Sequence, residues 1–148
     1  MYPLKDIKIL DVSRLLPGSF CSQVLSDLGA QVVKIEEPSV GDYYRALPGG
    51  EEFIGAGQFE ALNHNKKSLA LNLKTAEGKE IFQKLVPHFD IVIEGFRPKV
   101  VQKIGLDYPT FKKLHPKVIL CSITGYGQTG PLKDAAGHDL NYISHSGV

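Results

Sequence analysis

The stretch IKILDVSRLLPGSFCSQVLSDLGAQVVKIEEP, residues 7–38, holds two β-branched apolar runs on either side of a helical pattern. The runs 7–13 and 30–38 predict two buried strands. Residues 20–29 predict a helix between them, because their apolar residues recur at helical spacing on one side: Phe20, Val24, Leu25 and Leu28. A strand, a helix and a strand in this order indicate a βαβ unit with parallel strands.

The same alternation continues along the chain. Further strands are predicted over 90–96 and 117–127, and an edge strand or extended arm over 67–73. Helices are predicted over 76–89, 97–106 and 108–116, and Thr75 as a cap and Pro98 at a helix start support the first two. The glycine-rich segments 39–61 and 128–139 are predicted to be loops. The pattern predicts an α/β fold, a Rossmann-like parallel sheet with helices on both faces.

The composition excludes several classes of function. The 17 basic and 16 acidic side chains are balanced, which argues against binding to nucleic acid or to an anionic membrane by bulk charge. There is no signal-peptide pattern and no run of about 18 apolar residues, so we expect a cytoplasmic protein with no membrane segment. Cys21 and Cys121 are expected to be small buried apolar residues. The histidines show no ligand spacing, so no metal site is predicted.

The ends of the predicted strands carry candidate ligand-binding residues. Arg14 follows the first strand and Arg97 follows the third, in loops rich in glycine and hydroxyl groups. Ligands of open parallel sheets gather at the carboxyl ends of strands, and these residue types suit an anionic or phosphorylated ligand. The GxGxxG, GxxxxGK[ST] and GxSxG patterns are missing, which argues against a nicotinamide dehydrogenase, a nucleotide hydrolase and a serine hydrolase.

Near the end of the printed sequence, Gly137-His138-Asp139 places an imidazole beside a carboxylate. Taken alone, the pair is compatible with an acid and a base, with a nucleophile and a neighbour, or with two polar residues in a turn. Asp139 is also a candidate N-cap, because the amphipathic segment 140–147 follows it.

Four collinear segments carry a resemblance to a known family: DVSRLLPGSFCSQVLSDLGAQVVKIEEPSVGDYYR, LNHNKKSLALNLKTAEGKEIFQKL, DIVIEGFRPKVVQKIGL and SITGYGQTGPLKDAAGHDLNYISHSGV. Together they resemble the family III coenzyme A transferases (CaiB/BaiF), a family that includes the 2-methylacyl-CoA racemases. The resemblance implies that residues 1–148 are the N-terminal part of a Rossmann-like CoA-binding large domain. It further implies a small domain and a C-terminal part outside this chain, and an interlocked homodimer for the whole protein.

The resemblance also assigns roles to residues. It implies that coenzyme A is bound as part of the substrate, with no covalently bound cofactor, and that the partners are acyl-CoA, or CoA and a carboxylic acid. The residues that it places against CoA are Arg14, Leu15, Asn63, Asn65, Lys66, Lys67, Arg97 and Lys103. The diphosphate and the ribose phosphate of CoA need separate cations and donors of this kind. We therefore expect one cleft to join the asparagine- and lysine-bearing segment to His138.

Three functions follow from the resemblance. In a racemase of 2-substituted acyl-CoA, His138 is one of two bases, and Asp139 caps the following helix or orients His138. GHDLNY resembles this branch most closely. The second base of that branch is an aspartate beyond Val148, so this polypeptide alone is expected to be inactive. In a CoA transferase, Asp139 instead attacks the thioester and forms an anhydride and then an aspartyl-CoA thioester. The third function is a non-catalytic CoA-binding or assembly module.

Overall fold

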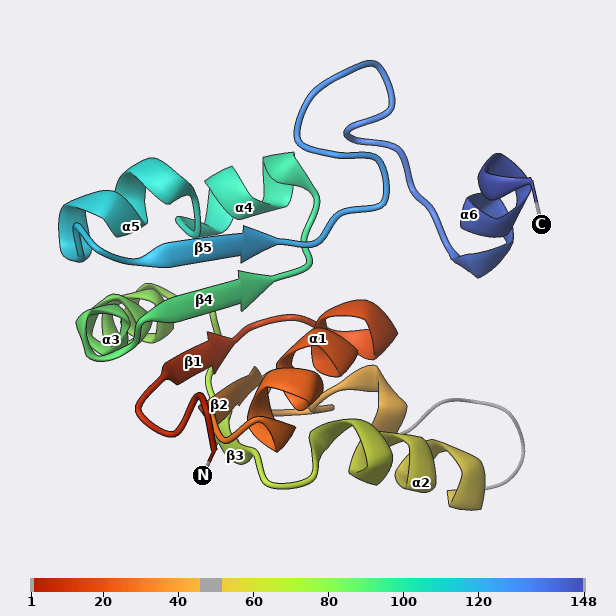
Figure 1. Cartoon of the computed structure of the whole chain (residues 1–148). Coiled ribbons are helices and arrows are strands. Elements are labelled where there is room, and N and C mark those ends of the chain that lie inside the picture. The colour runs from red at the N-terminus through yellow and green to blue at the C-terminus, as the bar shows by residue number, and fades with distance from the viewer. Residues whose placement is uncertain (1, 46–51, 148) are drawn as a thin grey trace.

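The protein is built around a five-stranded sheet in the order β3-β2-β1-β4-β5, in which each neighbouring pair is parallel. The computed structural model describes residues 2–45 and 52–147. The arrows of β1, β4 and β5 in Figure 1 point the same way, as the predicted βαβ units require. The strands are β1 (Lys8–Asp11), β2 (Gln31–Glu36), β3 (Lys67–Ala70), β4 (Ile91–Glu94) and β5 (Ile119–Ser122). The predicted α/β fold with a parallel sheet is confirmed.

Helices cover both faces of this sheet. On one face, apolar side chains of the strands pack against α3 (Ala76–Leu85), α4 (Pro98–Ile104) and α5 (Tyr108–Leu114), with Phe82 and Phe111 fully buried between them. On the other face, Ile9, Val32 and Ile93 pack against α1 (Leu15–Asp27), and α2 (Glu52–Asn63) contacts α1. Cys21 and Cys121 pack against this second cluster, half-buried rather than buried as predicted.

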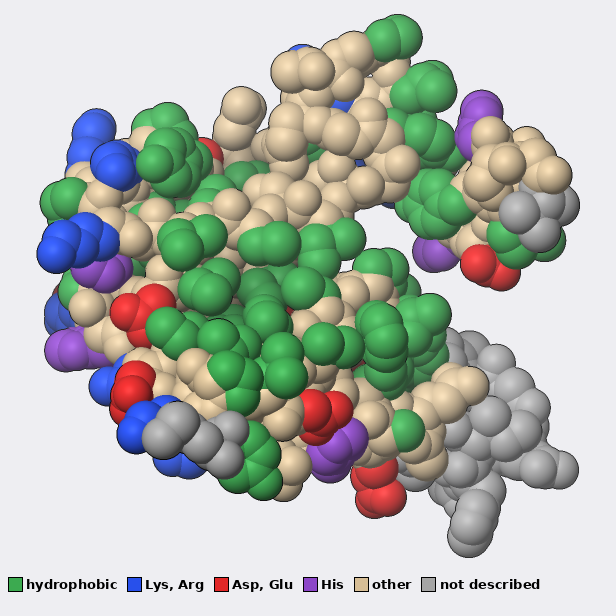
Figure 2. Space-filling view, viewed as in Figure 1, with side chains coloured by type: hydrophobic (Ala, Val, Ile, Leu, Met, Phe, Trp, Pro, Cys, Tyr) green, Lys and Arg blue, Asp and Glu red, His purple; other side chains and the backbone are tan. Residues whose placement is uncertain are grey.

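Helix α1 differs from its prediction in its start and in its orientation. It begins at Leu15 rather than at residue 20, and Pro17 lies in its first turn, where a missing N–H costs no hydrogen bond. The residues that it buries are polar or glycine: Gly18, Ser19, Ser22, Gln23 and Ser26. The predicted apolar side is largely outside, with Phe20 58% and Val24 42% exposed. Figure 2 shows apolar side chains gathered over this part of the surface.

The prediction of an irregular loop over 39–61 is wrong for its second half, which forms a helix. A 3-10 turn η1 (Tyr43–Arg45) follows β2, and α2 occupies Glu52–Asn63 although it contains Gly55 and Gly57. Interior glycines cost a helix about 1 kcal/mol each, which packing against α1 and η1 offsets here. Pro48, Gly49 and Gly50 of the predicted loop lie outside the described residues.

The remaining elements agree with the sequence more closely. Thr75 caps α3 by accepting a hydrogen bond from the Gly78 N–H at 3.1 Å, and Pro98 begins α4, both as predicted. The helix predicted over 76–89 divides into α3 and a 3-10 turn, η2 (Val86–His88), which contains Pro87. The final helix, α6 (Asp139–Ser146), lies beyond the arrowheads of β4 and β5 in Figure 1.

No helix within residues 2–45 and 52–147 has the length and hydropathy needed to cross a membrane. Across the same ranges, no group of three or more His, Cys, Asp and Glu side chains is arranged as a metal-binding set.

Candidate active site

The strand order creates a switch point between β1 and β4. From β1 the chain builds the sheet outward through β2 and β3, and then returns to add β4 and β5 on the other side of β1. The loops that follow β1 and β4 therefore diverge at the carboxyl edge of the sheet, which is where open α/β sheets bind ligands. Arg14 and Arg97 lie in these loops and Leu15 begins α1 directly after Arg14, so the structure brings three predicted CoA contacts to one edge.

Arg14 is held between aromatic side chains at this switch point. Its Nη1 donates a hydrogen bond to the Tyr43 hydroxyl at 2.9 Å. The guanidinium carbon lies 5.3 Å from the centre of the Tyr43 ring and 5.6 Å from that of Phe96. Such cation–π contacts orient a guanidinium without neutralising its charge. Among the side chains that the structure describes, no carboxylate forms an ion pair with Arg14.

A cavity of about 190 Å³ opens beside Arg14. Its wall combines Arg14 and Lys74 with Glu36, Glu37 and the apolar side chains of Phe96 and Val100. Glu36 is already occupied by Arg45, whose Nε lies 2.7 Å from Oε2. Burial opposes ionisation of Glu36, but hydrogen bonds from Arg45 and Ser68 outweigh it and lower its pKa to about 2. Glu36 is therefore ionised and paired with Arg45, so the other charged groups of this wall are the cations Arg14 and Lys74 and the carboxylate of Glu37.

A neutral set of four buried charges lies between this edge and α1. The Asp11 carboxylate accepts hydrogen bonds from Ser13 and Ser22, and its Oδ2 lies 3.8 Å from Lys34 Nζ and 3.7 Å from Lys66 Nζ. Asp42 completes the set, with its Oδ2 3.1 Å from Lys34 Nζ. We call Asp11, Lys34, Asp42 and Lys66 the buried charge cluster. It explains the orientation of α1, because only the polar side of that helix supplies hydrogen-bond partners to buried charges.

The predicted CoA contacts Lys66 and Asn63 belong to this interior. The Lys66 side chain is 1% exposed, and its ammonium donates to the Ser19 carbonyl, the Ser22 hydroxyl and Asn63 Oδ1 at 2.8–2.9 Å. Burial lowers the pKa of Lys66 to about 8. All three donors of the ammonium are used inside the protein, so the predicted contact of Lys66 with a phosphate would require one of them to change its partner.

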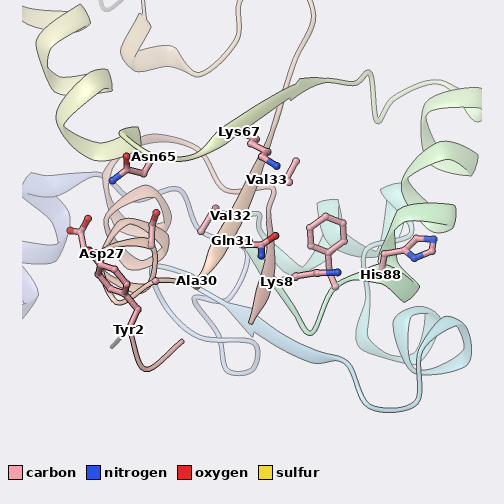
Figure 3. Close-up of a pocket in the computed structure, with 13 residues that line it drawn as sticks. Tyr2, Lys8, Asp27, Ala30, Gln31, Val32, Val33, Asn65, Lys67 and His88 are labelled. Carbon is pink, nitrogen blue, oxygen red and sulfur yellow. The ribbon is translucent and has the colours of Figure 1, made fainter. Parts of the chain in front are cut away.

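Asn65, Lys67 and Lys103 lie away from the switch point. Asn65 and Lys67 line a cavity of about 700 Å³ together with Lys8 and Gln31, the first residues of β1 and β2 (Figure 3). That cavity is at the amino edge of the parallel sheet, opposite to the carboxyl edge that carries Arg14. Lys103 is in the last turn of α4, about 8 Å along the helix axis from the end that follows β4. Neither of these two cavities is lined by His138, so the expected single cleft is not found in them.

His138 and Asp139 begin α6, after the loop that leaves the carboxyl end of β5. His138 rather than Asp139 is the N-cap, and its backbone N–H donates to Asn141 Oδ1 at 3.0 Å. Asp139 is exposed in the first turn. Burial, and then the negative charges of Asp42 and Asp139, raise the pKa of Tyr44. Figure 2 shows open space between α6 and the helices nearest to it.

Glu94 is a residue at the switch point that the sequence predictions did not single out. It ends β4, is 0% exposed, and accepts a hydrogen bond from the Phe96 N–H at 2.8 Å through Oε2. Its Oε1 has no hydrogen-bond partner among the described residues. Burial raises the pKa of Glu94. The detectable signal was an acidic residue at the end of an otherwise apolar strand, in IVIEGF.

We expect Glu94→Gln to change the pH dependence of folding stability. The unfolded chain releases this proton near pH 4.5, whereas the folded protein retains it to a higher pH, so wild-type stability falls as the pH rises through that window. Near pH 4 the two proteins should differ least. Above pH 4 the free energy of unfolding of Glu94→Gln should rise relative to that of the wild type, by about 1.4 kcal/mol per unit by which the Glu94 pKa is raised. Urea unfolding between pH 4 and 8 measures this, with the exposed Glu60→Gln as control; parallel pH profiles for wild type and Glu94→Gln would contradict it.

Comparisons with known proteins support a single family. Residues 4–148 match the family model described as CoA-transferase family III. The chain is 42% identical to a succinate–glutarate CoA-transferase from Agrobacterium fabrum, in an alignment that covers 98% of this chain and 38% of that protein. It is 40% identical to the human succinyl-CoA:glutarate CoA-transferase, covering 99% of this chain and 33% of that protein. A formyl-CoA:oxalate CoA-transferase from Escherichia coli is 39% identical, with coverages of 93% and 33%.

Solved structures agree with these relatives. A CaiB/BaiF family protein from Brucella suis superposes with a TM-score of 0.89 at 39% identity, covering 98% of this chain and 39% of that one. A hypothetical protein from Mycobacterium tuberculosis gives a TM-score of 0.89 at 32% identity, with coverages of 99% and 40%. The chain therefore spans less than half the length of the relatives that it matches. Because the family model covers nearly all of it, the chain belongs to CoA-transferase family III.

Proposed function

We propose that this chain is the N-terminal part of the large domain of a CoA transferase, which exchanges CoA between an acyl-CoA and a free carboxylic acid. The observation that carries the proposal is the pairing of family membership with relatives that are CoA-transferases by name. Those names favour the transferase over the racemase, which the GHDLNY segment had placed first.

The switch point supplies the chemistry that binding of CoA needs. Arg14 and Arg97 carry charges that suit the phosphates of CoA, and Phe96 and Leu15 add apolar surface beside them. The parallel sheet supports this edge rigidly, which is where such ligands are expected. The proposed contact set does not extend to Lys66, whose donors are used internally, or to residues at the amino edge.

The reaction also requires an enzyme carboxylate. Its attack on the thioester carbonyl expels the CoA thiolate and leaves a mixed anhydride. The thiolate then attacks the enzyme's own acyl carbon, which releases the donor acid and leaves an enzyme-bound CoA thioester. The acceptor acid reverses these two steps and leaves as the new acyl-CoA. Asp139 is the carboxylate that the family resemblance assigns to this role.

The test uses the full-length protein with succinyl-CoA and glutarate, the two acids in the names of its relatives, as probes. We expect glutaryl-CoA to form, and hydroxylamine to trap an enzyme-bound acyl group. Loss of this trapping in Asp139→Asn would assign the carboxylate to Asp139. Full retention of trapping in Asp139→Asn would mean that another carboxylate of the full-length protein attacks the thioester. No CoA exchange with these acids or with formyl-CoA and oxalate would contradict the transferase.

The racemase is kept as a second candidate, because Gly137-His138-Asp139 places an imidazole at the carboxyl side of the sheet. A racemase would exchange the α-hydrogen of a 2-methylacyl-CoA with solvent deuterium, and His138→Ala would abolish that exchange. CoA exchange without deuterium incorporation would exclude it.

A further inference from the structure

Asp42 joins three segments that surround the switch point. Its side chain belongs to the turn between β2 and η1 and is 2% exposed. Its Oδ2 lies 3.1 Å from Lys34 Nζ of β2 and accepts a hydrogen bond from the Leu15 N–H at 3.3 Å. Its Oδ1 accepts a hydrogen bond from the Tyr44 N–H at 3.0 Å. A single buried carboxylate therefore connects the sheet, the start of α1 and the turn η1.

The Leu15 backbone is strained at this contact. Its φ is 61°, in the left-handed region that a branched side chain adopts only when its surroundings hold it there. The hydrogen bond from its N–H to Asp42 is one such restraint, and Asp42 is itself fixed by Lys34. The strained residue directly follows Arg14, so the path of the backbone at Leu15 determines where the Arg14 side chain starts.

Arg14 and Tyr43, which contact each other, each precede a residue whose backbone N–H donates a hydrogen bond to Asp42. The Leu15 N–H follows Arg14, and the Tyr44 N–H follows Tyr43. The guanidinium then donates to the Tyr43 hydroxyl and faces the rings of Tyr43 and Phe96. A change in Asp42 would release both sides of this contact together, whereas the sheet beneath it would keep its backbone pairing.

We propose that Asp42 is a positioning residue for acyl-CoA: it fixes the Arg14 guanidinium, through Leu15 and Tyr44, in the orientation that receives a phosphate of CoA. This inference rests on the proposed function. Asp42 itself is buried and does not touch the ligand, so its effect must pass through Arg14.

A double-mutant cycle on the full-length protein tests this, with the dissociation constant of CoA measured by calorimetry. Loss of one charged hydrogen bond predicts that Arg14→Ala weakens CoA binding at least about tenfold, and we expect Asp42→Asn to weaken it by up to a similar factor. The double variant should bind no more weakly than Arg14→Ala alone, because Asp42 has no route to the ligand once Arg14 is gone. Ser22→Ala removes a hydrogen bond to Asp11 in the same cluster and should leave CoA binding unchanged.

Leu15→Gly tests the same idea without removing a buried charge. Glycine adopts a positive φ freely, so the melting temperature should not fall, while the loosened start of α1 should weaken CoA binding several-fold more than Leu15→Ala does, which loses the same apolar side chain but keeps the restricted backbone. If wild type binds CoA but Asp42→Asn and Leu15→Gly bind it equally well, or if the effects of Asp42→Asn and Arg14→Ala simply add, the positioning role is wrong and the proposed function stands. If wild type binds no CoA, the proposed function fails and this inference fails with it.

Discussion

Replacing Asp11 by asparagine should lower the free energy of unfolding by about 3–5 kcal/mol, the usual cost of removing one partner from a buried ion pair. Asp11 is 0% exposed, and its two oxygens accept hydrogen bonds from Ser13 and Ser22. The substitution would leave the ammonium groups of Lys34 and Lys66 with Asp42 as the remaining carboxylate of the buried charge cluster. One carboxylate oxygen is also replaced by an NH₂ group, which cannot accept the hydrogen bonds that the oxygen accepted.

Urea unfolding of both proteins measures this loss. Glu80→Gln is the matched control, because it also removes a carboxylate from a lysine partner, Lys84, at 2.7 Å. Those two side chains are 66% and 72% exposed, so solvent screens the pair and the control should change stability far less than Asp11→Asn does. Equal small losses in Asp11→Asn and Glu80→Gln would show that the buried charge cluster contributes no more than a surface pair.

Gly18→Ala should destabilise the protein by about 3 kcal/mol, although alanine favours a helix. Gly18 lies in the first turns of α1, and a Cβ there would overlap the Cβ and Oγ atoms of Ser13. Ser13 cannot move aside cheaply. Its N–H and hydroxyl donate to Asp11, and its carbonyl accepts from Lys34. The added methyl must therefore displace α1 or the loop that follows β1.

Gly57→Ala is the control for this substitution. Gly57 is an exposed residue of α2, and a Cβ there meets nothing within 4 Å. Helix propensity alone then applies, so this variant should be more stable than wild type by up to about 1 kcal/mol. Thermal unfolding monitored by circular dichroism compares the two. A gain of stability in Gly18→Ala would mean that α1 is free to shift away from Ser13.

Local patterns were sufficient for most of the fold. The strands at 7–13 and 90–96 were predictable because their β-branched runs have strand length and end at turn residues. Thr75 and Pro98 marked helix starts because capping and the first-turn preference of proline act between near neighbours. The start of α1 and the existence of α2 were missed, because proline and glycine were taken as breakers where tertiary packing holds the helix.

The candidate site was predictable in part for a similar reason. Once parallel strands were expected, Arg14 and Arg97 had to lie at the same edge, because they follow strands that run in the same direction. Lys66 and Lys67 were predicted to act together, but the structure places their side chains in different surroundings. Successive side chains in extended backbone point to opposite sides, so one lysine enters the interior and its neighbour lines a cavity at the amino edge.

The sequence by itself determined the parallel α/β architecture, the family and the edge that carries Arg14 and Arg97, because each depends on local periodicity or on segments in collinear order. Only the tertiary structure decided that α1 turns its polar side inward and that Asp11, Lys34, Asp42 and Lys66 share one buried site. Those residues come from segments far apart in the chain. Whether one side of a helix faces the sheet or the solvent depends on the charges that lie beneath it. Those charges belong to other segments, so the sequence of the helix alone does not predict the outcome.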